Sequence, residues 1–301
     1  MYKLNQLFKY LILAATMAGC QSNPVCPSDS EATLSFKPAA AADNWLAVPF
    51  PLNLPSETGA PVWDNYPNPF NVGLLDDYLK VATRDSDGYG LNGAVYFSFS
   101  QPLNTTGLPP QHASATSDKI ALIDIDPDSA EYGRLFPVRW EYWAQTQSYV
   151  KANTLAVAPH WGFPLNESTT YALIIRQGLS STDGEPFAAD PALGALLSDA
   201  GASGCGQTMP EETYEGLNNS FELLRDYLSN ASIDPATVIG ASVFTTQSTT
   251  YELGEIYQQI QNAAAPAYQG DAWQTMDEDQ GLNFETKSFQ WNSSDTTEFY
   301  L

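Results

Sequence analysis

A series of short β-type segments between residues 91 and 177 is the feature that most restricts the fold. In the first segment, Val95, Phe97 and Phe99 recur at every second position, which places them on one face of an extended chain. No helical pattern alternates with these segments, so we predict a mainly β fold with an antiparallel β-sandwich over residues 45–189. The other segments are rich in β-branched or aromatic residues and are separated by turn sequences: 119–126, 134–140, 154–158 and 170–177.

Helical patterns follow the β-rich region. Asp190-Pro191 has the residue types of a helix cap and a first-turn proline. A second helix is predicted from apolar residues spaced by three and four: Tyr214, Leu217, Phe221, Leu224 and Leu228. Thr250 precedes a third, with Leu253, Ile256, Tyr257 and Ile260 on one side. We expect a strand over 238–246, and we expect residues 190–265 to pack on the sandwich as added helices.

The first twenty residues have the pattern of an export signal. Lys3 and Lys9 supply positive charge, an apolar run follows over 11–15, and small residues precede Cys20. The apolar run is too short to span a bilayer, which needs roughly 20 residues. The run Met17-Ala18-Gly19-Cys20 resembles the bacterial lipobox, although Met17 stands where Leu is usual.

This resemblance implies removal of residues 1–19 and attachment of acyl chains such as palmitate to Cys20. Because Gln21 is not Asp, it also implies sorting to the outer membrane, outside the cytoplasm. The alternative is an ordinary secretory peptide with an unmodified Cys20. Residues 20–44 are small and polar and are expected to form a tether.

Charge excludes one class of partner. The signal contains two of the 12 basic residues and none of the 35 acidic ones, so the mature chain carries a net charge of −25. Such a chain repels phosphate backbones, so we expect no nucleic-acid binding and a membrane contact only through the lipid. Cys26 and Cys205 are expected in an oxidising compartment, where they either form a disulfide or remain free thiols.

Two segments resemble known surface proteins. The first, 154–186, contains Thr154-Leu155-Ala156-Val157-Ala158-Pro159, Thr170-Tyr171-Ala172-Leu173-Ile174-Ile175 and Asp183-Gly184, and is similar to the last two strands of bacterial Ig-like domains. The second, 241–247, together with Val48-Pro49-Phe50-Pro51 resembles the N-terminal region of bacterial surface lipoprotein lipases. The resemblance implies an Ig-like sandwich that precedes an α/β-hydrolase domain.

The hydrolase domain itself is not among these residues. We expect it beyond Leu301, because 285–301 has the pattern of extended chain after an acidic linker, so that 266–301 forms a linker and the start of a further, truncated domain. A natural terminus whose last strand pairs within the existing sheet is the alternative.

Motifs for catalysis are missing from the sequence. A nucleophile elbow needs G-x-S-x-G, and the sequences around Ser203 and Ser242 do not complete it. His112 and His160 have no triad spacing and are interpreted as structural side chains. We therefore expect no catalytic residues and no enzymatic activity from the residues present.

Two groups of side chains are candidates for binding. Calcium, the only cofactor considered, would use carboxylates in two clusters, whose alternative role is in solvated turns: Asp85 and Asp87, then Asp124, Asp126 and Asp128. Trp140, Tyr142 and Trp143 would bind a sugar or a protein partner if exposed, and would otherwise fill the core.

The leading hypothesis is a non-catalytic module of an outer-membrane or cell-surface lipoprotein that serves as a spacer, a support or a binding domain. The alternatives are the N-terminal part of a surface lipase or esterase, and a carbohydrate- or calcium-binding module.

Overall fold

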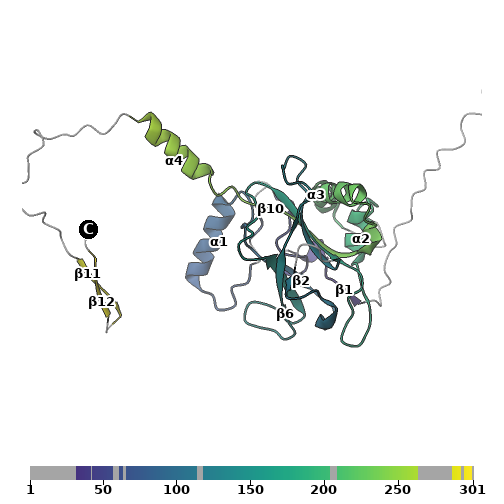
Figure 1. Ribbon diagram of the computed structural model, residues 1–301. Helices are drawn as coiled ribbons and strands as arrows, with labels where there is room; N and C mark the ends of the chain where they lie inside the picture. Colours follow the sequence, from purple (N-terminus) through teal and green to yellow (C-terminus); the bar gives the residue numbers. More distant parts are fainter. Residues whose placement is uncertain are drawn as a thin grey trace, which may run out of the picture. The chain divides into compact units, whose positions relative to one another are not determined.

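The computed structural model describes residues 32–41, 43–56, 61–63, 66–113, 118–203, 209–263, 287–292 and 295–299. The chain divides into two units, one up to Thr249 and one from Thr250 onward (Figure 1). Cys20, Cys26 and Cys205 lie outside the described residues, so lipidation and the disulfide remain predictions.

Two four-stranded antiparallel sheets form the centre of the first unit. One has the strand order β2-β7-β6-β3, with bounds Val95–Ser98, Thr154–Pro159, Val138–Trp143 and His112–Ala113. The other has the order β10-β8-β4-β5, with bounds Val238–Thr245, Thr170–Arg176, Ile120–Asp124 and Leu135–Phe136. A short parallel pair joins β1 (Ala32–Thr33) to β9 (Phe187–Ala188).

The two sheets share one hydrophobic core. Phe97 of β2 and Leu155 of β7 belong to the same buried cluster as Leu122 of β4 and Leu173 of β8. These residues come from the predicted alternating segments, in which every second side chain points to the same face. In both sheets, the apolar side chains at every second position of these strands therefore face the core, as predicted.

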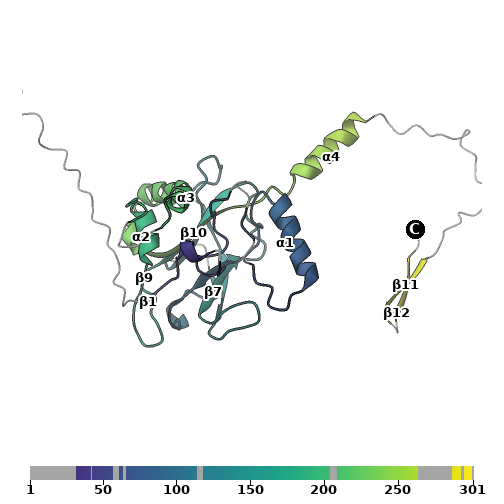
Figure 2. The same ribbon diagram turned by 180° about the vertical axis from the view of Figure 1, so that it is seen from behind.

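Helices cover the far face of the second sheet. Ile174 of β8 and Val243 of β10 form a second buried cluster with α2 (Pro191–Leu197) and α3 (Glu211–Asn230). Figures 1 and 2 show these two helices side by side next to β10. Because β8 and β10 are covered on both faces, their sequences are apolar almost without interruption.

The helices confirm part of the prediction and add to it. The Asp190 side chain accepts a hydrogen bond from Ala192 N at 3.0 Å and caps α2, as its sequence predicted. The predicted amphipathic helix is α3. The helix α1 (Gly73–Asp85) was not predicted. Short 3-10 turns occur at Pro38–Ala40, Thr105–Gly107 and Pro235–Thr237.

The fold is mixed α/β, with small antiparallel sheets and four helices in the described residues, and so is not mainly β as predicted. The predicted antiparallel strands with added helices are confirmed in this coarser form. The fold contains more helix than the apolar periodicity alone indicated, because of α1 and the 20 residues of α3.

The proline-rich segment before α1 crosses from one sheet to the other. Phe50 pairs with Tyr96 of β2 through two backbone hydrogen bonds, of 3.1 and 2.7 Å. Three residues later, Asn53 N donates to Val243 O of β10 at 2.8 Å. The segment therefore lies in extended form over the core, as the prolines predicted.

The second unit contains α4 (Tyr251–Asn262) and an antiparallel hairpin of β11 (Lys287–Asn292) and β12 (Asp295–Phe299). The sequence grouped α4 with the helices that pack on the sandwich, whereas the division of the chain places it in this unit, and none of its residues is buried. Within the part of the chain that the structure describes, no helix is long and apolar enough to cross a membrane.

Candidate binding site

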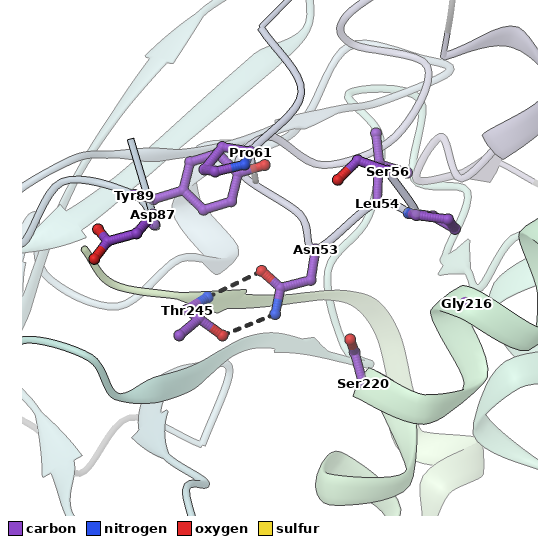
Figure 3. Close-up of a pocket in the computed structure, with 11 residues that line it drawn as sticks. Asn53, Leu54, Ser56, Pro61, Asp87, Tyr89, Gly216, Ser220 and Thr245 are labelled. Atoms are coloured by element: carbon purple, nitrogen blue, oxygen red, sulfur yellow. Dashed lines mark hydrogen bonds between the residues drawn. The ribbon is translucent and has the colours of Figure 1, made fainter. Parts of the chain in front are cut away.

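A cleft of about 450 Å³ opens between the proline-rich segment, the turn before β2, α3 and the end of β10 (Figure 3). It is much larger than the cavity that lies beside it. Its walls come from four segments that are distant in sequence. The residues that line it are Asn53, Leu54, Pro55, Ser56, Pro61, Asp87, Gly88, Tyr89, Gly216, Ser220 and Thr245.

Two glycines allow the walls of the cleft to approach each other. A Cβ on Gly216 of α3 would lie 2.3 Å from Pro55 Cγ, so only glycine lets the proline-rich segment rest on the helix. A Cβ on Gly88 would lie 2.4 Å from Gln247 N. At that point the backbones of Tyr89 and Gln247 are hydrogen-bonded, since Gln247 N donates to Tyr89 O at 2.9 Å.

The polar side chains of the cleft are held by hydrogen bonds within the protein. Asn53 Nδ2 donates to Thr245 Oγ1 at 2.9 Å, and Thr245 N donates to Asn53 Oδ1 at 3.0 Å (Figure 3). Asp87 accepts from Ser248 N at 3.0 Å and from Ser248 Oγ at 2.5 Å. Burial raises the pKa of the Tyr89 phenol to about 12, and its hydroxyl donates to Leu52 O at 2.8 Å.

The lining combines polar and apolar groups and carries one acidic side chain. Among the described residues that line the cleft, Asp87 is the single carboxylate, and no histidine, cysteine, lysine or arginine occurs. Asp87 accepts its hydrogen bonds from Ser248, which is not among the lining residues. The cleft therefore offers hydroxyl and amide groups to a ligand, and its described lining has no histidine, lysine or cysteine that could activate a hydroxyl or act as a nucleophile.

An aromatic cluster adjoins the cleft through Tyr89. Phe50 lies 5.9 Å from Tyr89 and 5.7 Å from Trp63 between ring centroids, and Trp45 lies 5.3 Å from Tyr96. The edge-to-face geometry of these pairs is the arrangement that aromatic rings prefer. A second, much smaller cavity beside them is lined by Trp45, Phe50, Leu54, Tyr66 and Tyr89, among others.

The predicted aromatic residues separate onto the two faces of β6. Trp140 and Tyr142 pack against the core, and Trp140 Nε1 donates to Pro109 O at 3.0 Å. Trp143 points to the opposite face and stacks on Tyr96 at 6.3 Å with an interplanar angle of 23°. The structure therefore brings Trp143 alone of the three to the aromatic cluster.

Four of the five predicted acidic side chains have partners within the protein, and Asp128 contributes its backbone N–H. Asp85 forms an ion pair with Arg84 at 2.5 Å, and Asp87 lies in the cleft. Asp124 accepts from Ser129 Oγ at 2.6 Å, and burial raises its pKa. Asp126 accepts from Asp128 N at 3.0 Å and from Thr170 N at 3.1 Å.

These bonds shape the turn between β4 and β5. In the described residues, no group of three or more His, Cys, Asp or Glu side chains is placed to hold a metal ion. The calcium hypothesis therefore gains no support from the described side chains.

The two candidate serines, Ser203 and Ser242, and both histidines lie outside the cleft. Ser242 is buried in β10 and its Oγ donates to Pro51 O, so it serves the fold. Ser203 follows α2, and the rest of its motif lies outside the described residues. His112 and His160 lie together, with ring centroids 5.5 Å apart, and neither lines the cleft.

Sequence reasoning missed Asn53, Ser220 and Thr245. Gly216 was the available signal, because a glycine inside an amphipathic helix often marks a close approach of another segment.

No protein-family model and no curated protein sequence matches this chain. Among solved structures, the chain matches the N-terminal part of the bacterial S-layer protein SbsC at 13% identity and a TM-score of 0.20, over 38% of this chain and 27% of that one. It also matches domains 1–6 of the same surface-layer protein at 13% identity and a TM-score of 0.20, over 39% of this chain and 15% of that one. A TM-score of this size supports no conclusion about fold or function.

Proposed function

We propose that the chain is the precursor of a non-catalytic module of an outer-membrane or cell-surface lipoprotein, with the cleft as its binding site. The observation that carries the proposal is the lining of the cleft, whose described residues combine hydroxyl and amide groups without a histidine, cysteine or lysine. Binding sites need a few convergent polar groups in a concavity, and the cleft has them.

The leader supports the location. Its charged start, apolar run and small residues before Cys20 suit export and lipid attachment. Several acyl chains attached to this one cysteine would hold the protein at a membrane. A single chain would not anchor it stably. The shared core of two antiparallel sheets supports an Ig-like sandwich as the scaffold, with α2 and α3 as additions to it.

Ester hydrolysis by the detergent-solubilised mature chain tests the non-catalytic part of the proposal. The substrates are p-nitrophenyl acetate and a long-chain p-nitrophenyl ester. We expect the rate with either ester to equal that of the Ser220→Ala variant and of buffer. Turnover above buffer that Ser220→Ala abolishes would overturn the proposal, because Ser220 is a hydroxyl of the cleft.

Carbohydrate binding is the more specific candidate function, favoured by the amide of Asn53 and the hydroxyls of Ser56, Ser220 and Thr245 in the lining of the cleft. Amide and hydroxyl groups suit the hydroxyls of a neutral sugar. A neutral glycan array should show ligands for the wild type that are lost in Ser220→Phe, whose side chain fills the cleft. Equal glycan binding by both proteins would exclude the cleft as the site.

A further inference from the structure

The outer edge of the first sheet gathers both histidines of the chain beside an arginine and an exposed tryptophan. His112 of β3 is the cross-strand partner of Arg139 of β6, and His160 follows the last residue of β7. The turn after β7 adds Trp161 and Phe163. These five residues form the His-Arg-Trp cluster, which shares no residue with the cleft.

The side chains of the cluster are in mutual contact. The guanidinium carbon of Arg139 lies 4.8 Å from the centroid of the Trp161 ring, a cation–π contact. The His112 ring lies 5.6 Å from Trp161 and 5.5 Å from His160. The ring centroid of Phe163 lies 6.4 Å from that of His160.

A tight turn presents the two aromatic rings to solvent. Phe163 N donates to His160 O at 3.0 Å, and Gly162 between them has φ +85°, a conformation that favours glycine. Trp161 is 66% exposed and Phe163 is 44% exposed. Large aromatic side chains at this exposure are available to a ligand.

Arg139 is the unusual charge in this chain. Its Nε is buried and has no hydrogen-bond partner among the described residues. Arg84 and Arg134 each pair with a carboxylate, and Arg176 and Arg225 donate to uncharged oxygens. Arg139 forms neither kind of contact with the described part of the chain. Glu141, the nearest acid along β6, lies on the same face of the strand as Arg139 but forms no ion pair with Arg139. The chain has 35 acidic and 12 basic residues, so an arginine with neither an acidic partner nor a hydrogen bond among the described residues stands out.

We propose that the His-Arg-Trp cluster binds a carboxylate-bearing sugar residue of an acidic polysaccharide. The planar guanidinium of Arg139 matches a carboxylate through paired N–H donors. His112 can supply a further ring N–H donor at the same place, while His160 Nδ1 donates to Trp161 O at 3.2 Å. Trp161 and Phe163 offer flat faces on which the apolar face of a sugar ring can lie. The strongly negative chain would repel an acidic polymer elsewhere, so the binding would be confined to this cluster.

Isothermal titration calorimetry of the mature chain in non-ionic detergent tests this proposal. The probes are a galacturonic acid trimer and a neutral galactose trimer. We expect the acidic trimer to bind the wild type at least about tenfold more tightly than the neutral one, because the carboxylate forms charge-assisted hydrogen bonds. Added salt should weaken the acidic interaction.

Variants assign the binding to the cluster. Arg139→Gln and Trp161→Ala should each weaken the acidic trimer about tenfold or more, while Arg134→Gln, which removes an arginine with an acidic partner, should not change it. Circular dichroism checks folding, and Trp161→Ala decides the outcome if Arg139→Gln unfolds, because Trp161 is largely exposed.

Three results with the trimers would overturn the proposal. They are the absence of heat with the acidic trimer, equal affinity for both trimers, and equal affinity of the Trp161→Ala variant and the wild type. Inorganic phosphate that binds as tightly as the trimer would show a simple anion site and would overturn the assignment to a sugar. Failure of the neutral-glycan proposal for the cleft would leave these outcomes unaffected, because the two sites share no residue.

Discussion

Helices α3 and α1 have similar amphipathic sequences and opposite surroundings. In α3, Leu217, Phe221 and Leu224 are 0% exposed. In α1, Leu74 and Tyr78 are each 63% exposed, although they also lie four residues apart on one side of the helix. The difference shows that an apolar stripe predicts a helix, whereas its burial depends on whether a sheet face is available to cover it.

The second sheet provides that face for α3, together with α2, and not for α1. The apolar residues of α3 share a cluster with Ile174 and Val243 on the outer side of the second sheet. The inner side of that sheet is occupied by the other sheet. In α1, Leu75 and Leu79 are partly buried, and no residue of the helix is fully buried.

The largest effect should come from the centre of the α3 stripe. Phe221→Ala should lower the free energy of unfolding by about 3 to 5 kcal/mol, because it leaves a cavity beside Phe36, whose ring centroid is 5.8 Å away. Urea unfolding followed by circular dichroism measures the change. A loss below about 1 kcal/mol would show that the stripe is not packed.

A smaller effect should come from the glycine that lets Pro55 lie on α3. Gly216→Ala should lower the free energy of unfolding by about 1 to 2 kcal/mol, because overpacking exceeds the gain in helix propensity. Gly73→Ala in α1 is the matched control, since no heavy atom lies within 4 Å of the position that a Cβ would take there. Equal melting temperatures for the two variants would contradict the close approach.

Loss of the α2 cap should cost less. Asp190→Ala should destabilise the protein by about 1 kcal/mol, because Ala192 N loses its acceptor.

Burial raises the pKa of Asp190. The folded state therefore holds the proton more tightly, and the contribution of Asp190 to stability falls as pH rises from its ordinary unfolded value, about 3.9, through the raised folded value. Asp190→Asn should remove this dependence, so its stability relative to the wild type should increase with pH across that window. A difference in the free energy of unfolding between Asp190→Asn and the wild type that stays constant with pH would contradict the predicted direction.

The smallest effect belongs to α1. Tyr78→Ala should change the free energy of unfolding by less than about 0.5 kcal/mol, because the side chain is mostly in water. Urea unfolding beside Phe221→Ala makes the comparison direct. A loss comparable to that of Phe221→Ala would show that a partner covers α1 in solution.

Patterns that are local in sequence predicted most of the first unit. Val95, Phe97 and Phe99 defined an inward face by alternation, and Asp190-Pro191 marked the start of α2. Helix α1 was missed because Val72, at its cap position, has no capping side chain. Instead, the side chain of Asn68, four residues earlier, accepts from Val72 N at 2.9 Å.

The sites depend on contacts that local patterns do not contain. Asn53 and Thr245 are 192 residues apart and meet only when the proline-rich segment lies along β10. His112 and His160 meet through the register of β3, β6 and β7. Trp140 and Trp143 were grouped by sequence, but an odd spacing in a strand places them on opposite faces.

Lipid attachment at Cys20 is the most direct test that this fold serves as a membrane-anchored surface module. Cells that express the wild type or Cys20→Ser are labelled with radioactive palmitate and separated into membrane and soluble fractions. We predict a labelled wild type in the membrane fraction and an unlabelled Cys20→Ser variant that is soluble or retains its leader. Labelling and membrane association that are the same in both proteins would contradict the proposal.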